Sequence, residues 1–137
     1  MKKIIFVILV LLFSFNCYAL TKEEAYDVKT YLFIQGKTAE KINELFGKLN
    51  EGLTYADVVS DKLGRWENRY RGEVEPVPEA AQKLDALMND YFAAAEQYFK
   101  AYRVKDTRND PELKGKLKEL YREIKREEGQ LKIEIGE

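Results

Sequence analysis

The chain has 137 residues, of which 45% are hydrophobic and 34% charged, and its formal net charge is −1. It contains one Cys and no His. Without imidazole, Ser-His-Asp and Cys-His catalytic sites are excluded, and so are His-ligated metal and haem sites. We therefore expect no catalytic residues of these kinds, no metal site and no cofactor.

Residues 1–19 have the pattern of a secretory signal peptide. Two lysines follow the initial Met, residues 4–15 are almost entirely apolar, and Cys17 and Ala19 place small residues three and one positions before a cleavage site. A membrane-spanning helix needs about 20 apolar residues, which is more than this run supplies. The pattern favours cleavage after Ala19 and a periplasmic or secreted protein over a retained anchor.

A lipoprotein is the minority alternative, in which Cys17 carries a lipid after cleavage. The residues before it, Phe15 and Asn16, fit poorly to a bacterial lipobox, which resembles Leu-Ala-Gly-Cys. Contact with a membrane is therefore expected only if Cys17 is lipidated or the signal is retained.

Cleavage would leave residues 20–137, a chain of 118 residues with neither Cys nor His. This length suits one domain that is held together by its core. Loss of the two N-terminal lysines changes the net charge from −1 to −3. Nucleic acid is not expected as a partner, because phosphate binding needs a clustered positive surface.

Hydrophobic residues recur at helical spacing from the start of this domain. A capping box at Thr21–Glu24 predicts a helix that begins there and extends to about residue 50. Gly36, followed by a capping residue at Thr38, could divide it in two. A second capping box at Thr54–Asp57 predicts a helix over 54–71.

The second half of the domain begins with a linker over 71–78, where two prolines and a glycine interrupt the helical pattern. Residues 78–104 carry the clearest helical stripe, and Asp110 followed by Pro111 predicts the start of a last helix over 111–128. Apolar and polar residues alternate in the tail 129–137, which suits a short strand, a helical extension or an extended tail equally. The fold class is all-α, a small antiparallel bundle of about four helices.

The segment around Trp66 is the first candidate for a binding surface. Arg65 and Arg69 are four residues apart and share one helix face, while Trp66 and Tyr70 share the adjacent face. Trp, Tyr and Arg dominate protein interfaces. The alternative is that the two aromatic residues anchor the core and the arginines pair with nearby glutamates.

The aromatic stripe of the third helix is the second candidate. Tyr91, Tyr98 and Tyr102 could line a ligand pocket, with their hydroxyl groups at its edge. Core packing requires the same spacing and is the favoured interpretation.

We therefore expect a non-enzymatic binding or adaptor protein that recognises its partner through a helix face. Inhibitors, immunity-type factors, chaperone-like proteins and envelope-complex subunits belong to this class, and the partner would be another envelope or extracellular protein, with a homodimer as an alternative. A small-ligand sensor or carrier is the second hypothesis. A carboxylate-dependent hydrolase is the third and weakest, because the acidic pairs Asp57/Asp61 and Glu119/Glu123 look like the solvated charge of helix faces.

The signal-peptide interpretation predicts the N-terminus of the protein after export. Expression of the full chain in a Gram-negative host, followed by intact-mass measurement and N-terminal sequencing, should give a chain that starts at Leu20. A chain that still starts at Met1, or an acylated Cys17, would contradict this prediction.

Overall fold

The computed structural model describes residues 20–104 and 110–137. The predicted signal peptide and most of the predicted polar loop at 106–110 lie outside these residues. The described part forms four α-helices and one short 3₁₀ helix, namely α2 (Lys22–Asn50), α3 (Ala56–Val74), η1 (Glu79–Ala81), α4 (Gln82–Val104) and α5 (Pro111–Glu134).

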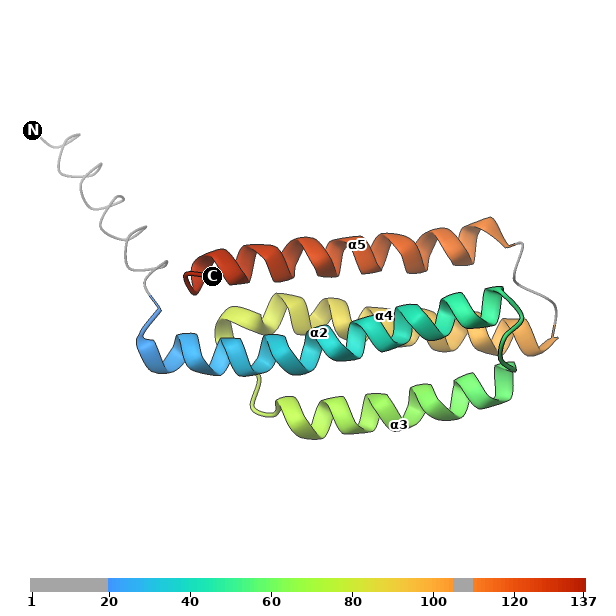
Figure 1. The fold of residues 1–137 in the computed structure, drawn as a ribbon, viewed down its shortest axis with the longest axis horizontal. Helices are drawn as coiled ribbons and strands as arrows, with labels where there is room; N and C mark the ends of the chain where they lie inside the picture. Colours follow the sequence, from blue (N-terminus) through green and yellow to red (C-terminus); the bar gives the residue numbers. More distant parts are fainter. Residues whose placement is uncertain (1–19, 105–109) are drawn as a thin grey trace, which may run out of the picture.

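The four α-helices pack into an elongated bundle, which confirms the all-α prediction (Figure 1). Consecutive helices run in opposite directions along the long axis. The helices α2 and α4 each pack against both α3 and α5. Short connections between long helices favour this arrangement of neighbours.

Side-chain caps fix two of the helix starts as predicted. The Thr21 hydroxyl accepts a hydrogen bond from the Glu24 amide at 3.1 Å, and the Glu24 carboxylate accepts one from the Thr21 amide at 2.9 Å. At the start of α5, the Asp110 carboxylate accepts hydrogen bonds from two amides of the first turn. The predicted capping box at Thr54 is wrong, because α3 begins at Ala56 and its N-cap residue, Tyr55, makes no side-chain cap.

The helix α2 continues through Gly36, so of the two alternatives at this position, a break or a tolerated glycine, the second is correct. The Thr38 hydroxyl donates to the Ile34 carbonyl at 2.8 Å and does not cap a new helix. Buried residues occur on both sides of Gly36, from Val28 to Leu49. Packing of one continuous apolar stripe thus outweighs the low helix propensity of a single glycine.

Two other helix ends lie beyond the predicted positions. The helix α3 continues to Val74, which is buried, so the connection to η1 is only Glu75–Pro78 and contains a cis Glu75–Pro76 bond. The helix α5 continues to Glu134, and Leu131 occupies the buried stripe seven residues after Ile124. Of the three alternatives for the C-terminal tail, the helical extension is therefore correct through residue 134.

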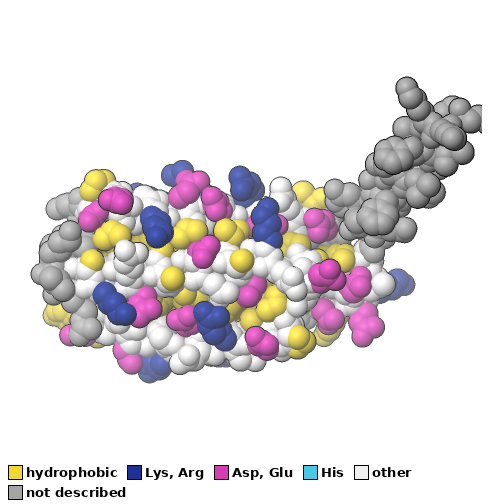
Figure 2. Space-filling view, turned by 180° about the vertical axis from the view of Figure 1, so that it is seen from behind, with side chains coloured by type: hydrophobic (Ala, Val, Ile, Leu, Met, Phe, Trp, Pro, Cys, Tyr) yellow, Lys and Arg dark blue, Asp and Glu magenta, His cyan; other side chains and the backbone are white. Residues whose placement is uncertain are grey.

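The core is built from apolar side chains of all four α-helices, and the stripe predicted for the third helix lies inside it. Its most deeply buried large members are Tyr70, Tyr91, Tyr98, Phe92, Phe99, Ile42, Leu49, Leu84, Met88, Ile124 and Leu131. The outer surface carries interspersed charges of both signs with hydrophobic side chains between them, as Figure 2 shows for the face opposite to that of Figure 1. None of the helices within the described residues is long and apolar enough to cross a membrane.

The continuity of α2 makes a prediction about two glycines. A Cβ atom at Gly36 would lie 3.7 Å from Glu128 Oε1, which is ordinary contact, and one at Gly64 would meet no atom within 4 Å. Gly36→Ala and Gly64→Ala should each raise the free energy of unfolding by about 0.5–1 kcal/mol, because alanine favours the helix. Urea titration followed by circular dichroism measures this. A loss of stability in Gly36→Ala alone would mean that α2 is interrupted at residue 36.

Candidate functional site

A row of three pockets follows the line where α2 and α3 lie side by side, and we call it the α2–α3 groove. The pocket nearest the connection to η1, the linker-end pocket, has a volume of about 360 Å³. The central pocket measures about 200 Å³, and the loop-end pocket, near the turn between α2 and α3, about 510 Å³.

Shared lining residues join the three pockets into one groove. Ile34 and Glu73 line both the linker-end and the central pocket. Lys41 and Trp66 line both the central and the loop-end pocket. On α2 the lining residues range over 26–48, a stretch of about 33 Å at about 1.5 Å per residue. The groove is therefore long enough to accept a helix or an extended segment of another chain.

Large aromatic side chains stand exposed along the α2 side of the groove. Tyr26 is 70% exposed and Phe33 is 64% exposed, and their seven-residue spacing puts them on one face of the helix. The Lys37 ammonium lies 4.1 Å from the centre of the Phe33 ring, and the Lys41 ammonium lies 5.8 Å from that of Trp66. Rings flanked by cations suit a partner that offers both apolar and acidic groups.

The four residues of the predicted binding surface around Trp66 do not all lie on the surface of the protein. Trp66 is partly buried against the core and lines the groove beside Arg69. Arg65 is exposed and its guanidinium pairs with Asp61 at 2.8 Å, outside the pocket linings. Tyr70 is only 1% exposed and contributes to the floor of the central pocket, so a partner would meet little of it.

Ion pairs hold the arginines of α3 along the helix, as the alternative interpretation expected. Arg69 Nε donates to Glu73 at 2.6 Å, and Arg71 donates to Glu67 at 2.8 Å. The hydrogen bond to Glu73, followed by the charge of that carboxylate, raises the pKa of Arg69. Across the groove, the hydrogen bond from Lys48, followed by its charge, lowers the pKa of Glu44. These exposed pairs contribute little to stability but fix where the charges stand.

Beneath the groove, a chain of buried hydroxyl groups connects three helices. The hydroxyl of Tyr70 on α3 donates to the Asp85 carboxylate of α4 at 2.7 Å. It lies 2.7 Å from the hydroxyl of Tyr31 on α2, which must donate to it because Tyr70 has only one proton to give. Burial is the main cause that raises the pKa of both tyrosines above 10. This chain fixes the position of Tyr70, one turn from Trp66.

The second candidate, the tyrosines of α4, lies in the packed interior. Tyr91 and Tyr98 are buried, whereas Tyr102 is partly buried against the core. The Tyr98 ring makes an edge contact with Phe46 at 5.0 Å, and its hydroxyl donates to the Asn50 side chain at 2.9 Å. None of the three tyrosines lines a pocket of the groove. Their contacts are those of a core, and a ligand-pocket role for them has no support beyond the sequence pattern.

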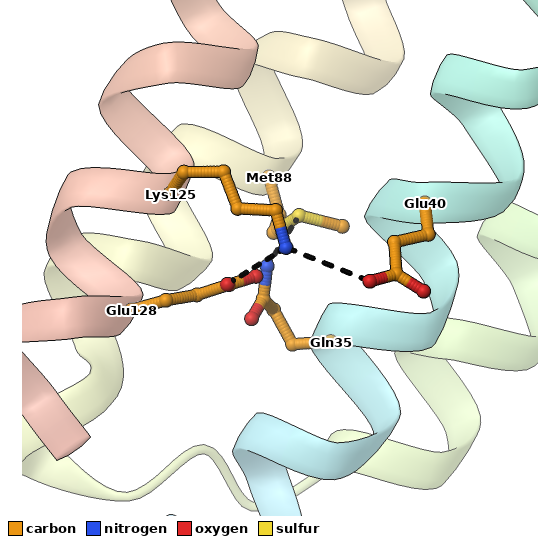
Figure 3. Close-up of polar contacts among 5 residues, drawn as sticks. All are labelled: Gln35, Glu40, Met88, Lys125 and Glu128. Carbon is orange, nitrogen blue, oxygen red and sulfur yellow. Dashed lines mark hydrogen bonds and ion pairs between the residues drawn. The ribbon is translucent and has the colours of Figure 1, made fainter.

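A buried polar cluster, which the sequence pattern did not predict, lies between α2, α4 and α5 (Figure 3). Gln35 is 0% exposed and its amide donates to the Met88 sulfur at 3.4 Å. Glu128 is 5% exposed and accepts a hydrogen bond from Lys125 at 3.0 Å, while Lys125 also lies 3.7 Å from Glu40. Within the described residues, one oxygen of Gln35 and one of Glu128 have no hydrogen-bond partner.

The surroundings of this cluster shift the pKa of Lys125. Burial lowers its pKa, but the hydrogen bond and the charge of Glu128 outweigh burial, so the pKa is raised overall. A sequence signal for Gln35 existed, because it lies four residues after Tyr31 and four before Ala39, both of which belong to the apolar stripe of α2.

Comparison with protein-family models, with curated proteins and with solved structures gives no significant match. In the described ranges 20–104 and 110–137, no three His, Cys, Asp or Glu side chains are grouped so that they could hold a metal ion. The interpretation of the α2–α3 groove therefore depends on its own geometry and charge.

The buried tyrosines predict a loss of stability in alkali. The pKa values of Tyr31, Tyr70 and Tyr91 are raised above 10 in the folded protein, so above pH 10 only the unfolded chain releases these protons. Ionisation of these tyrosines should leave the free energy of unfolding unchanged below pH 10. Above pH 10 it should lower the free energy of unfolding by about 1.4 kcal/mol per pH unit for each tyrosine.

The variant Tyr70→Phe isolates one of these protons. It should be less stable than the wild type by about 1–3 kcal/mol at pH 8, because Tyr31 and Asp85 lose their shared partner. Above pH 10 its free energy of unfolding should fall less steeply than that of the wild type, by about 1.4 kcal/mol per pH unit, because one tyrosine proton is missing. Urea titrations from pH 8 to 11.5 measure both effects, with Tyr55→Phe as an exposed control. Equal slopes in Tyr70→Phe and the wild type would contradict the assignment.

Proposed function

We propose that this chain is an exported, non-enzymatic binding or adaptor protein of a bacterial envelope, and that it recognises another protein chain through the α2–α3 groove. The observation that carries the proposal is the exposure of Tyr26 and of Phe33, which shares the central pocket with Trp66, along a groove that extends for most of α2. Exposed rings of this size are unfavourable in water and are typical of surfaces that become covered.

The chemistry of the central pocket supports recognition of protein. Trp66 offers a partly buried indole, and Arg69 and Lys41 stand at the same pocket. Tryptophan and arginine are the residue types that contribute most to binding energy at interfaces. The location is proposed on the pattern of residues 1–19 alone. An inhibitor, an immunity-type factor, a chaperone-like protein and an envelope-complex subunit would all use such a surface.

The test is a pull-down in which the protein, expressed as the full chain, is the bait and captures its partner from cell-envelope extract. Phe33→Ala and Trp66→Ala should each weaken capture of the bound protein by roughly 30-fold, the equivalent of about 2 kcal/mol for an interface anchor. Phe33 is largely exposed, so its replacement leaves the core intact.

Arg126→Ala, an exposed change on α5, is the matched control and should leave capture unchanged. Binding that survives both groove variants, or that is lost in Arg126→Ala, would place the binding surface elsewhere. Circular dichroism on each variant separates loss of binding from loss of fold.

A further inference from the structure

The two ends of the α2–α3 groove carry opposite charge. The linker-end pocket is lined by Asp27, Glu73 and Glu75 and by no basic residue, and Glu73 is already paired with Arg69 at 2.6 Å. The loop-end pocket is lined by three lysines and a single acid, Glu44, which is already paired with one of them at 2.6 Å; the lysines are Lys41, Lys48 and Lys62. A partner that covers the whole groove must therefore present basic groups at one end and acidic groups at the other.

We propose that the partner which the groove fits is a second copy of this chain, bound across a two-fold axis. This inference depends on the proposed function, since it names the occupant of the same surface. A two-fold axis perpendicular to the groove turns the second copy end for end. The acidic end of each copy then faces the basic end of the other, and the contact is made twice.

The apolar groups of the groove are also arranged about this two-fold axis. The lining residues of α2 range over 26–48, so their midpoint lies at Lys37. Phe33 and Lys41 are equally distant from that midpoint, and Trp66 lies beside Lys41. Rotation about the midpoint therefore brings Phe33 level with the partner's Lys41 and with the Trp66 ring beside it.

The outer hydrophobic residues match as well. Tyr26 lies at the acidic end of the groove, and Leu53, which is 69% exposed, lies at the basic end beside Lys48. The rotation sets Tyr26 against the partner's Leu53. Four exposed or partly exposed hydrophobic groups on each copy thus lie level with apolar groups of the other copy, and charges of opposite sign surround them.

The size of the groove determines how strong such a dimer should be. Two adjacent helices about 10 Å apart over about 33 Å offer a footprint of about 650 Å² on each copy. A stable protein–protein interface buries about 800 Å² on each partner. The dimer should therefore be weak and concentration-dependent, and its ionic contacts should make it weaker in high salt.

Charge reversal at each end provides the test, with sedimentation velocity on the protein expressed as the full chain. The basic-end variant is Lys41→Glu with Lys62→Glu, and the acidic-end variant is Asp27→Lys with Glu75→Lys. All four side chains are exposed, and none forms an ion pair with another described residue. Lys118→Glu with Arg126→Glu, on the exposed face of α5, is a control that changes the charge equally.

The wild type and the α5 control should dimerise between about 10 and 500 μM, within the range expected of a small interface. Each groove variant alone should associate at least 10-fold more weakly, because like charges then meet at both ends. An equimolar mixture of the two groove variants should recover a one-to-one dimer, because a groove with net negative charge at both ends then faces one with net positive charge at both ends.

Three results would overturn the proposal. These are a wild type that stays monomeric at 500 μM, groove variants that dimerise as the wild type does, and a mixture that stays monomeric although both variants are folded. A monomeric wild type whose capture of an envelope protein is nevertheless lost in Phe33→Ala would reject the second copy as occupant while leaving the proposed function intact. Capture that is insensitive to Phe33→Ala and Trp66→Ala would reject the proposed function itself.

Discussion

The hydroxyl chain Tyr31–Tyr70–Asp85 is the constraint on which the arrangement of α2, α3 and α4 depends. A buried phenol hydroxyl without a partner is costly, so α3 must lie where the Tyr70 hydroxyl meets one group from α2 and one from α4. That position also fixes the groove, because Tyr70 contributes to the floor of its central pocket. The shape of the α2–α3 groove thus depends on the buried hydrogen bonds of the Tyr70 hydroxyl.

Features set by near neighbours in the chain were predictable from the sequence. The caps at Thr21 and Asp110 involve residues within three positions of each other, and the core stripe of α4 follows from periodicity alone. The choice between a break and a tolerated glycine at Gly36 was open from the sequence, and continuous packing on both sides of the glycine decides it against the break. The tail extends as helix because Leu131 continues the seven-residue repeat of Leu117 and Ile124 into the core, although the alternation of residues 131–135 fits a strand equally well.

The candidate site was predictable only on its α3 side. Trp66 and Arg69 do lie together at the groove, but the separation of Tyr70 from the surface depends on Tyr31 and Asp85, which are 39 and 15 residues away in the chain. The α2 side was missed, although Tyr26 and Phe33 stand off the apolar stripe of their helix. Large rings outside the apolar stripe were the available signal, and the placement of Phe33 in one pocket with Trp66 required the tertiary structure.

The polar cluster of Gln35, Lys125 and Glu128 has a consequence for the alignment of α5 along the bundle. The buried residues Leu117, Ile124 and Leu131 recur every seven positions, and such a repeat alone would pack almost equally well after a shift of two turns. Such a shift would misplace Glu128, which lies beside Gly36 of α2, where a side chain is absent, and would separate Lys125 from Glu40 of α2, which is 3.7 Å away. We infer that these polar groups select a single register for α5, much as one buried polar residue does in a coiled coil.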